Sequence, residues 1–198
     1  MNWMMKSPSI LKQNSDPLFL DTSVLINLLA CGKIGELAGA LGRPMIVEET
    51  VVRETRWHPK TKEDGTSAVR SLVGARVLQM AQMNEAQAIA FLELVGAASP
   101  DDLDDGEAAT LAITGGQGAV VIDERKGRRV AGEKFPELQV LSTLDIICCP
   151  QVIDQLGLDE SLLLVTEAKN VGRMRILPSW RDWLRFQFEA TGLESNAI

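Results

Sequence analysis

Four short apolar stretches of the chain are each followed closely by acidic side chains. The acids at these places are Asp21, then Glu48, Glu49 and Glu54, then Asp104, Asp105 and Glu107, and finally Asp123 and Glu124. Carboxylates close to a core are unfavourable unless something neutralises them, and carboxylates held together raise each other's pKa. Because a divalent cation is the usual neutralising partner, this repetition predicts a shared metal site.

Each acid taken alone also has a purely structural interpretation. Asp21 and Asp123 can be N-caps of the helices that begin after them, a role that contributes about 1 kcal/mol. Asp104, followed three residues later by Glu107, resembles a capping box. Glu54 can be a surface glutamate paired with a neighbouring arginine. The convergence of these acids on one edge of a sheet is what favours the metal interpretation.

A regular alternation of strands and helices must position these acids. Apolar runs predict strands over 18–20, 45–47, 75–80, 119–122 and 138–141. Helical spacing, caps and stop signals predict helices from Asp21 to Gly32 and over 34–41, 48–57, 67–73, 84–95, 104–114 and 124–134. Such alternation predicts an α/β fold whose parallel sheet is covered on both faces, with all strand C-termini at one edge. Ligands bind at that edge in open α/β sheets.

The length of 198 residues predicts one domain with a C-terminal extension. We expect residues 1–16 to be a flexible leader, residues 17–157 to form the core, and residues 158–198 to be a helical extension packed on that core. Helices are predicted over 151–156, 161–171 and 180–191. The last segment is aromatic and amphipathic, so it is expected either to dock on the core or to form a homodimer or partner surface.

Composition argues against several classes of protein. His58 is the only histidine and no C-x-x-C pair occurs, which argues against a zinc site of cysteine and histidine and leaves only His58 for a Ser–His or Cys–His mechanism. The three cysteines do not suggest a disulfide framework, so we expect a reducing, cytoplasmic location. No apolar run reaches the length of a membrane span, and no membrane partner is expected.

The net charge of −7 speaks against a nucleic-acid partner when it is taken alone. Two basic clusters oppose that conclusion. The first is Arg125, Lys126, Arg128 and Arg129, directly after Asp123, and the second is Lys169, Arg173, Arg175, Arg181 and Arg185. A solvated helix face explains either cluster as well as a nucleic-acid contact does, and the sequence leaves both interpretations open.

The order and spacing of four segments resembles the PIN-domain family of metal-dependent ribonucleases. The segments are 21–28 (Asp-Thr-Ser-Val-Leu-Ile-Asn-Leu), 51–54 (Val-Val-Arg-Glu), 103–112 (beginning Leu-Asp-Asp-Gly-Glu-Ala) and 121–131 (containing Asp-Glu-Arg-Lys-Gly-Arg-Arg-Val-Ala). The similarity covers residues 17–157 and is closest to a branch with an L-D-x-G-E-A helix start. Many relatives in that branch resemble the toxin component of toxin–antitoxin pairs. Ser142 stands where relatives often have glycine.

The resemblance implies a three-layer α/β/α sandwich, an acidic site for Mg²⁺ or Mn²⁺, and cleavage of single-stranded RNA. Its catalytic acids correspond to Asp21, Glu54, Glu107 and Asp123, with Asp104 beside the third. We expect Asp21 and Asp123 to contact the metal directly and Glu107 or Asp104 to complete the site. Glu54 is expected to hold metal-bound waters or to orient the nucleophile. Either one or two ions would fit this number of acids.

Neighbours of these acids are expected to contact the substrate. Thr22 or Ser23 would steady the first carboxylate, and Arg125, Lys126, Arg128 and Arg129 would bind flanking phosphates. A toxin would also have an antitoxin protein that covers the acidic site. The alternative is a catalytically silent PIN-like module that binds RNA or a protein, which predicts neither cleavage nor a change in melting temperature with Mn²⁺.

Overall fold

The computed structural model describes residues 6–193, and its centre is a five-stranded sheet in which all strands run parallel. The strands are β1 (Leu18–Leu20), β2 (Met45–Glu48), β3 (Gln79–Ala81), β4 (Ala119–Val121) and β5 (Gln139–Leu141), in the order β3-β2-β1-β4-β5. Leu18 pairs with Met45 on one side and Ala119 on the other, so β1 is the central strand. The predicted α/β fold with a parallel sheet is confirmed.

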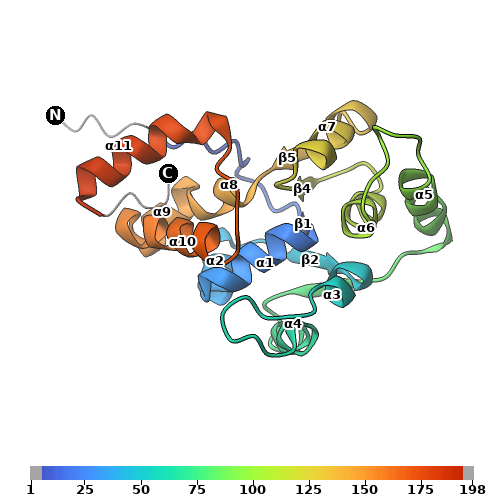
Figure 1. The fold of residues 1–198 in the computed structure, drawn as a ribbon, viewed down its shortest axis with the longest axis horizontal. Coiled ribbons are helices and arrows are strands. Elements are labelled where there is room, and N and C mark those ends of the chain that lie inside the picture. Colours follow the sequence, from blue (N-terminus) through green and yellow to red (C-terminus); the bar gives the residue numbers. More distant parts are fainter. Residues whose placement is uncertain (1–5, 194–198) are drawn as a thin grey trace.

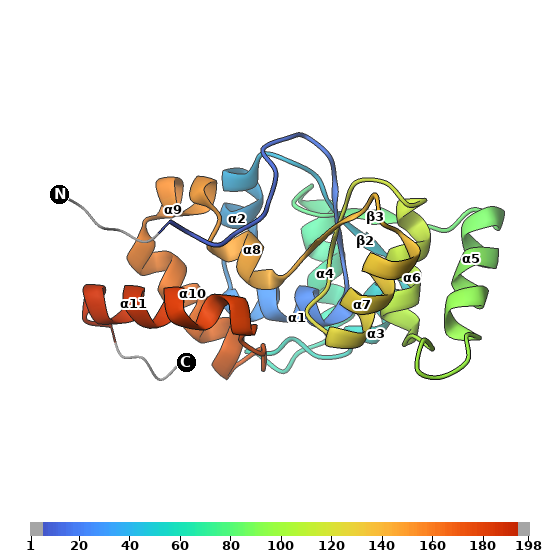
Figure 2. The same ribbon diagram turned by 90° about the horizontal axis from the view of Figure 1, so that it is seen from above.

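Helices cover both faces of the sheet and give the molecule three layers (Figures 1 and 2). They are α1 (Thr22–Cys31), α2 (Ile34–Leu41), α3 (Glu49–Glu54), α4 (Gly65–Gly74), α5 (Glu85–Val95), α6 (Asp105–Thr114), α7 (Arg125–Lys134), α8 (Thr143–Ile147), α9 (Pro150–Leu156), α10 (Leu158–Asn170) and α11 (Arg181–Thr191), with a 3₁₀ turn at Pro178–Trp180. No single helix within residues 6–193 is long and apolar enough to cross a membrane, although α1 and α2, bent by 107°, meet that test as a pair.

Alternation along the strands divides the core into two clusters. Leu18 and Leu20 point to the cluster formed with α1, α2 and the C-terminal helices, whereas Phe19 points to the cluster formed with α6 and α7. Successive strand residues face opposite sides of a sheet, so a strand buried on both faces must be apolar throughout. This is why the three residues of β1 are all apolar and all buried.

Two predicted elements are shorter in the structure by three residues or more. The strand predicted over 75–80 begins only at Gln79, because α4 continues to Gly74 and Arg76 then adopts a left-handed φ of 60°. The helix predicted over 48–57 ends at Glu54. The chain then turns so that Trp57 forms an isolated antiparallel bridge with Asp64.

Helix α8 is an element that the sequence patterns did not predict. Ser142 is its N-cap. In a capping box, the Ser142 side chain accepts the Asp145 N–H, and the Asp145 carboxylate accepts the Ser142 N–H. This S-x-x-D pattern was visible in the sequence, but α8 has only five residues, which is too short for a helical period to stand out.

The chain outside residues 17–157 also contacts the core. Ser7 Oγ donates to the Cys148 carbonyl at 2.5 Å, and the Ile10 N–H donates to Asp145 Oδ1 at 3.0 Å. Trp180 and Phe188 are 2% and 1% exposed and belong to the same apolar cluster as β1. Residues 1–5 of the expected leader and 194–198 of the expected extension lie outside the described residues.

Burial of Trp180 predicts that the extension contributes to the stability of the whole domain. We expect Trp180→Ala to lower the free energy of unfolding by about 3–5 kcal/mol, measured by urea denaturation followed by circular dichroism. Trp57, which is 67% exposed, is the matched control, and Trp57→Ala should change it by less than about 0.5 kcal/mol. Equal effects of the two substitutions would contradict the packing described for the extension.

Candidate active site

Polar side chains meet where β1, β4 and β5 end. Asp21 follows Leu20 and is the N-cap of α1, Asp123 lies just beyond β4, and Thr143 begins α8 just beyond β5. Helix α6 contacts β1, β2 and β4 and carries Glu107 in its first turn. The parallel sheet therefore gathers these groups at one edge, as expected for a ligand site in an open α/β fold.

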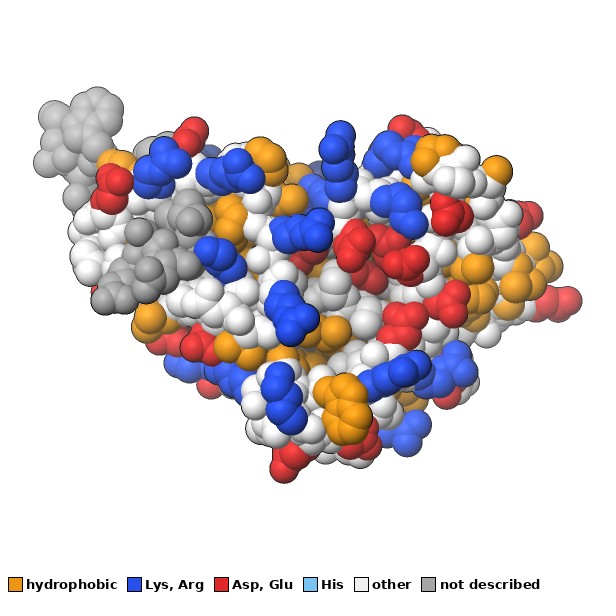
Figure 3. All heavy atoms as spheres, viewed as in Figure 1, with side chains coloured by type: hydrophobic (Ala, Val, Ile, Leu, Met, Phe, Trp, Pro, Cys, Tyr) orange, Lys and Arg blue, Asp and Glu red, His pale blue; other side chains and the backbone are white. Residues whose placement is uncertain are grey.

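Five carboxylates line one cavity of about 350 Å³ at this edge, which we call the acid cavity. They belong to Asp21, Glu54, Asp104, Glu107 and Glu124, and the wall is completed by Thr22, Ser23, Ile26 and Gly106. In Figure 3 acidic side chains gather on this face, with Lys and Arg side chains beside them. The structure thus brings four of the predicted site acids together and adds Glu124, which the predicted site omitted.

Glu107 has the least favourable surroundings of these acids. Its residue is 3% exposed, and neither carboxylate oxygen has a hydrogen-bond partner among the described residues. Burial is the main cause that raises its pKa from 4.5 to about 7, the nearby charges of Asp21, Glu124 and Asp104 raise it further, and Lys126 opposes them. A buried carboxylate without a partner is destabilising, so this group is suited to a ligand that the polypeptide does not supply.

Asp21 is both a helix cap and a member of the acid cavity. Its Oδ2 accepts hydrogen bonds from the Ser23 hydroxyl at 2.6 Å and the Ser23 N–H at 3.3 Å. Burial raises its pKa to about 6, against the lowering effect of these bonds, and the charge of Asp123 raises it slightly more. Because a carboxylate has about four acceptor positions, capping leaves room for a metal ion.

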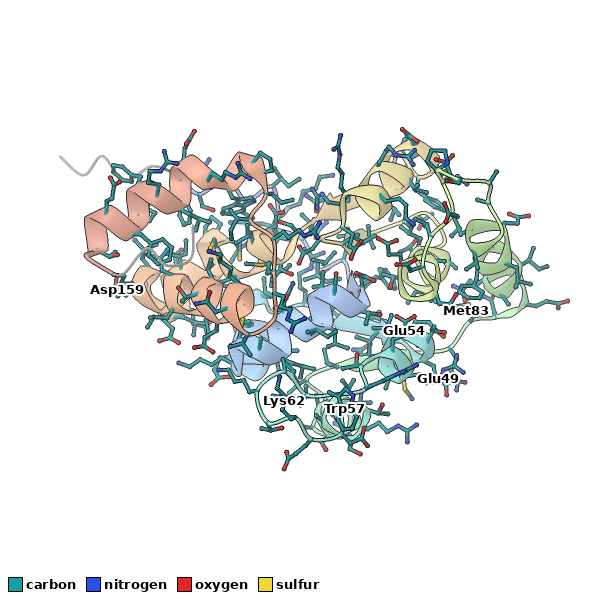
Figure 4. The ribbon with its side chains drawn as sticks, viewed as in Figure 1. Glu49, Glu54, Trp57, Lys62, Met83 and Asp159 are labelled. Atoms are coloured by element: carbon teal, nitrogen blue, oxygen red, sulfur yellow. The ribbon has the colours of Figure 1, made fainter. Side chains whose placement is uncertain are left out.

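Glu54 reaches the acid cavity from the end of α3 (Figure 4). Its Oε2 accepts a 2.6 Å hydrogen bond from the hydroxyl of Thr22, which is the first residue of α1. Gly106 lies directly over this bond, and a Cβ there would overlap both oxygen atoms. The glycine of the L-D-x-G-E-A segment therefore lets α6 approach α1 and α3 closely.

The capping-box interpretation of Asp104 and Glu107 is wrong. Asp104 is the N-cap of α6 by position, but its side chain makes no cap hydrogen bond. Glu124 is likewise the N-cap of α7 without a side-chain cap bond. These exposed carboxylates line the acid cavity without serving the helices that follow them, which favours a ligand role over a structural one.

Asp123 lies at the border of the acid cavity and lines an adjoining cavity of about 670 Å³. Ser23, Ile26 and Glu124 line both cavities, so the two spaces share a wall. The charge of Asp123 acts on Asp21, which places it close to the acids of the first cavity. The structure therefore sets Asp123 beside the other predicted acids and not among them.

Two residues that the predicted site omitted hold Asp123 in place. Its Oδ1 accepts the Thr143 N–H at 2.8 Å, and its Oδ2 accepts the Thr143 hydroxyl at 2.6 Å and the Asn27 side-chain amide at 2.8 Å. These bonds lower a pKa that burial raises. Asn27 was detectable in principle, because it is a polar residue among the buried apolar side chains of α1.

The four basic residues after Asp123 have different surroundings. Arg125 and Arg128 line the adjoining cavity, but the Arg128 Nη1 donates to the carbonyls of Ile122 at 3.0 Å and Leu141 at 2.7 Å. Arg129 pairs with Asp101 at 2.8 Å and Glu133 at 2.9 Å. The charge of Lys126 lowers the pKa of Glu107. Of the four, Arg125 combines a cavity position with a side chain that makes neither an ion pair nor a hydrogen bond to the described residues.

A divalent cation fits the chemistry of the acid cavity. Mg²⁺ and Mn²⁺ prefer carboxylate oxygens, and the unpartnered carboxylate of Glu107 lines the cavity together with Asp21, whose charge raises the pKa of Glu107. No three acidic, histidine or cysteine side chains of residues 6–193 stand at the spacing of a complete metal site. Small side-chain rotations toward an ion would therefore accompany binding. Gly127 leaves space for the Glu107 carboxylate, which a Cβ at position 127 would overlap.

The raised pKa of Glu107 predicts a pH-dependent cost of its burial. Between about pH 4.5 and 7 the folded protein holds this proton and the unfolded chain releases it, so the free energy of unfolding falls as the pH rises through this window. Glu107→Gln removes the titration. In EDTA at pH 8 we expect the variant to be more stable than the wild type by roughly 2 kcal/mol, or about 4–8 °C in Tm.

The difference in Tm between Glu107→Gln and the wild type should disappear near pH 4.5, where both side chains are uncharged. Glu93→Gln, at an exposed position of α5, is the matched control and should not change the pH profile. A Glu107→Gln protein that is less stable than the wild type at pH 8 would show that the Glu107 carboxylate has a stabilising partner.

Comparison with known families agrees with this geometry. A family model described as a PIN domain (DUF3368) matches residues 18–151, which include every residue of the acid cavity. PIN domains are typically nucleases and generally use divalent metals. No curated protein and no solved structure matches the chain significantly. Because the matched segment is more than half of the 198 residues, the chain belongs to the PIN-domain family.

Proposed function

We propose that the protein is a Mg²⁺- or Mn²⁺-dependent endoribonuclease that hydrolyses single-stranded RNA. The observation that supports this most strongly is the Glu107 carboxylate, which is buried, lacks a hydrogen-bond partner among the described residues and stands among other acids. A group of this kind is retained at a cost to stability, and it is expected at a site that binds a cation.

Each acid has a distinct part in the proposed reaction. Asp21 and Glu107 would hold the cation. Asp104, from the exposed side, and Asp123, from the adjoining cavity, would move their carboxylates toward the cation. A bound divalent ion supplies Lewis acidity and an ionised water near neutral pH. Glu54, oriented by the Thr22 hydroxyl, would accept a hydrogen bond from the attacking water. Arg125 would contact a phosphate that flanks the scissile bond.

The proposal requires no histidine. His58, the only histidine of the chain, is outside the acid cavity, and its Nδ1 accepts the backbone N–H groups of Lys60 and Thr61 at 3.3 Å. Proton transfer therefore falls to the carboxylates of the cavity. Burial disfavours the charged forms of Asp21 and Glu107 and raises their pKa values to about 6 and about 7, so a cation held by these two groups would favour loss of their protons.

Purified protein with Mn²⁺ should cleave a fluorescently labelled single-stranded RNA, and EDTA should stop the reaction. Asp21→Asn and Glu107→Gln should each lower kcat by more than about 100-fold. Mutation of residues that only hydrogen-bond to metal ligands already lowers metal affinity or activity by about 10–100-fold. Glu93→Gln should cleave like the wild type. Wild-type Tm should rise with Mn²⁺, and that of Glu107→Gln should not.

Cleavage that survives both Asp21→Asn and Glu107→Gln would contradict the proposed site. A catalytically silent module would show no cleavage and no Mn²⁺-dependent rise in Tm. The toxin role, the antitoxin partner, the cytoplasmic location and the homodimer stay predictions. The antitoxin prediction has a simple test, since a protein that covers the acid cavity should inhibit cleavage.

A further inference from the structure

Two cavities continue from the acid cavity along the C-terminal part of the chain. The adjoining cavity of about 670 Å³ shares Ser23, Ile26 and Glu124 with the acid cavity, and it shares Met174, Arg175 and Ile176 with a third cavity of about 810 Å³. The third cavity is bounded by α10, α11 and the segment that joins them. The shared lining residues place the three cavities next to one another in series, beginning at the acids, and we call this series the furrow.

Basic side chains outnumber acidic ones in the furrow beyond the acid cavity. They are Arg125, Arg128, Arg173 and Arg175 in the second cavity, and Lys169, Arg175, Arg181 and Arg185 in the third. The acids among the same linings are Asp123 and Glu124 at the border and Glu189 in the third cavity. This concentration of positive charge contrasts with the net charge of −7 for the whole chain.

Three of the arginines beyond residue 151 are available for a ligand. Arg173, Arg175 and Arg181 are exposed, and no ion pair or hydrogen bond joins their side chains to other residues of the described chain. Arg185 has only a 3.8 Å contact with Asp182. An arginine that served the fold would be expected to have a partner like those of Arg128 or Arg129. The exposed arginines of the furrow therefore have no evident structural role.

The joining segment is fixed to the acid site. Gly172 packs against Asn27 so closely that a Cβ there would overlap the Asn27 amide oxygen, and the amide nitrogen of Asn27 donates to Asp123. The Met174 N–H donates to the Ala168 carbonyl at 3.0 Å, which holds the segment against the end of α10. The basic side chains are thus held at a set position relative to the acids.

Apolar side chains in the second cavity indicate the form of nucleic acid. Ile26, Met174, Ile176, Leu177 and Pro178 line it beside the arginines. Unpaired bases expose flat faces that stack on arginine guanidinium groups and pack on apolar side chains, whereas a duplex buries its base faces and presents phosphates. A wall that is both basic and apolar therefore suits a single strand.

We propose that the furrow, where it passes along α10, α11 and their joining segment, is the binding track for the single-stranded polynucleotide, and that Arg173, Arg175 and Arg181 contact its phosphates on one side of the cleavage point. The inference rests on the proposed nuclease function, because that function places the cleavage point at the acid cavity. It adds a substrate-binding surface from residues that lie beyond the matched family segment, which ends at residue 151.

Binding can be measured separately from cleavage. In EDTA, the fluorescence anisotropy of a labelled 20-nucleotide single-stranded RNA should report binding without hydrolysis. Arg175→Gln combined with Arg181→Gln should raise Kd at least about tenfold. The slope of log Kd against log salt should fall by about 1.4, since each phosphate contact to a single strand contributes about 0.7.

The matched control is Arg70→Gln combined with Lys134→Gln, which makes the same change in net charge at exposed positions that line none of the three cavities. Its Kd should stay within twofold of the wild type. A Kd and salt slope unchanged by the Arg175 and Arg181 substitutions would overturn the track. So would a duplex of the same sequence that binds as tightly as the single strand.

The outcomes also separate this proposal from the nuclease proposal. If Asp21→Asn abolishes cleavage while the arginine double variant binds and cleaves like the wild type, the nuclease stands and the track is wrong. If no cleavage is seen but RNA binding depends on Arg175 and Arg181, the track stands and the nuclease is wrong. If both are right, the double variant should raise KM with little change in kcat. Asp21→Asn should lower kcat with little change in KM.

Discussion

The burial of the Glu107 carboxylate among other acids is the constraint on which this structure depends. At neutral pH its pKa of about 7 leaves the group partly ionised, and its oxygens have no hydrogen-bond partner within residues 6–193. The surroundings preserve this arrangement, because Gly127 leaves space for the carboxylate and Gly106 lets α6 approach the pair formed by Thr22 and Glu54. The apolar packing on both faces of the sheet provides the stability that such a group requires.

The acid cavity and the C-terminal helices are connected through Asp123. Its carboxylate is held by Thr143 from α8 and by Asn27 from α1, and Asn27 in turn packs against Gly172 at the end of α10. The extension also buries Trp180 and Phe188 in the apolar cluster that contains β1. A chain cut at the end of the matched family segment, residue 151, would therefore lose core packing and one wall of the site together.

Much of this arrangement could be predicted from the sequence, since Asp21 follows a strand that is apolar throughout and Glu107 lies in the first turn of a helix. Both signals are local. Three features could not be predicted because they depend on tertiary geometry: that Glu107 lacks the hydrogen bond of a capping box, that Asp123 sits at the border of the acid cavity, and that Asn27 and Thr143 hold it there. The five residues of α8 were too few to show a helical period, and the roles of Arg128 and Arg129 depend on partners distant in sequence or in other elements.

The central claim is that the acids of this cavity share a divalent cation. The most direct measurement is anomalous diffraction from crystals of the wild-type protein grown with Mn²⁺. The cation should lie in the acid cavity, bonded directly to Glu107 and Asp21 at about 2.1 Å, with the remaining positions filled by other carboxylates or water. An acid cavity without an anomalous peak at saturating Mn²⁺, or a peak that contacts neither Glu107 nor Asp21, would contradict it.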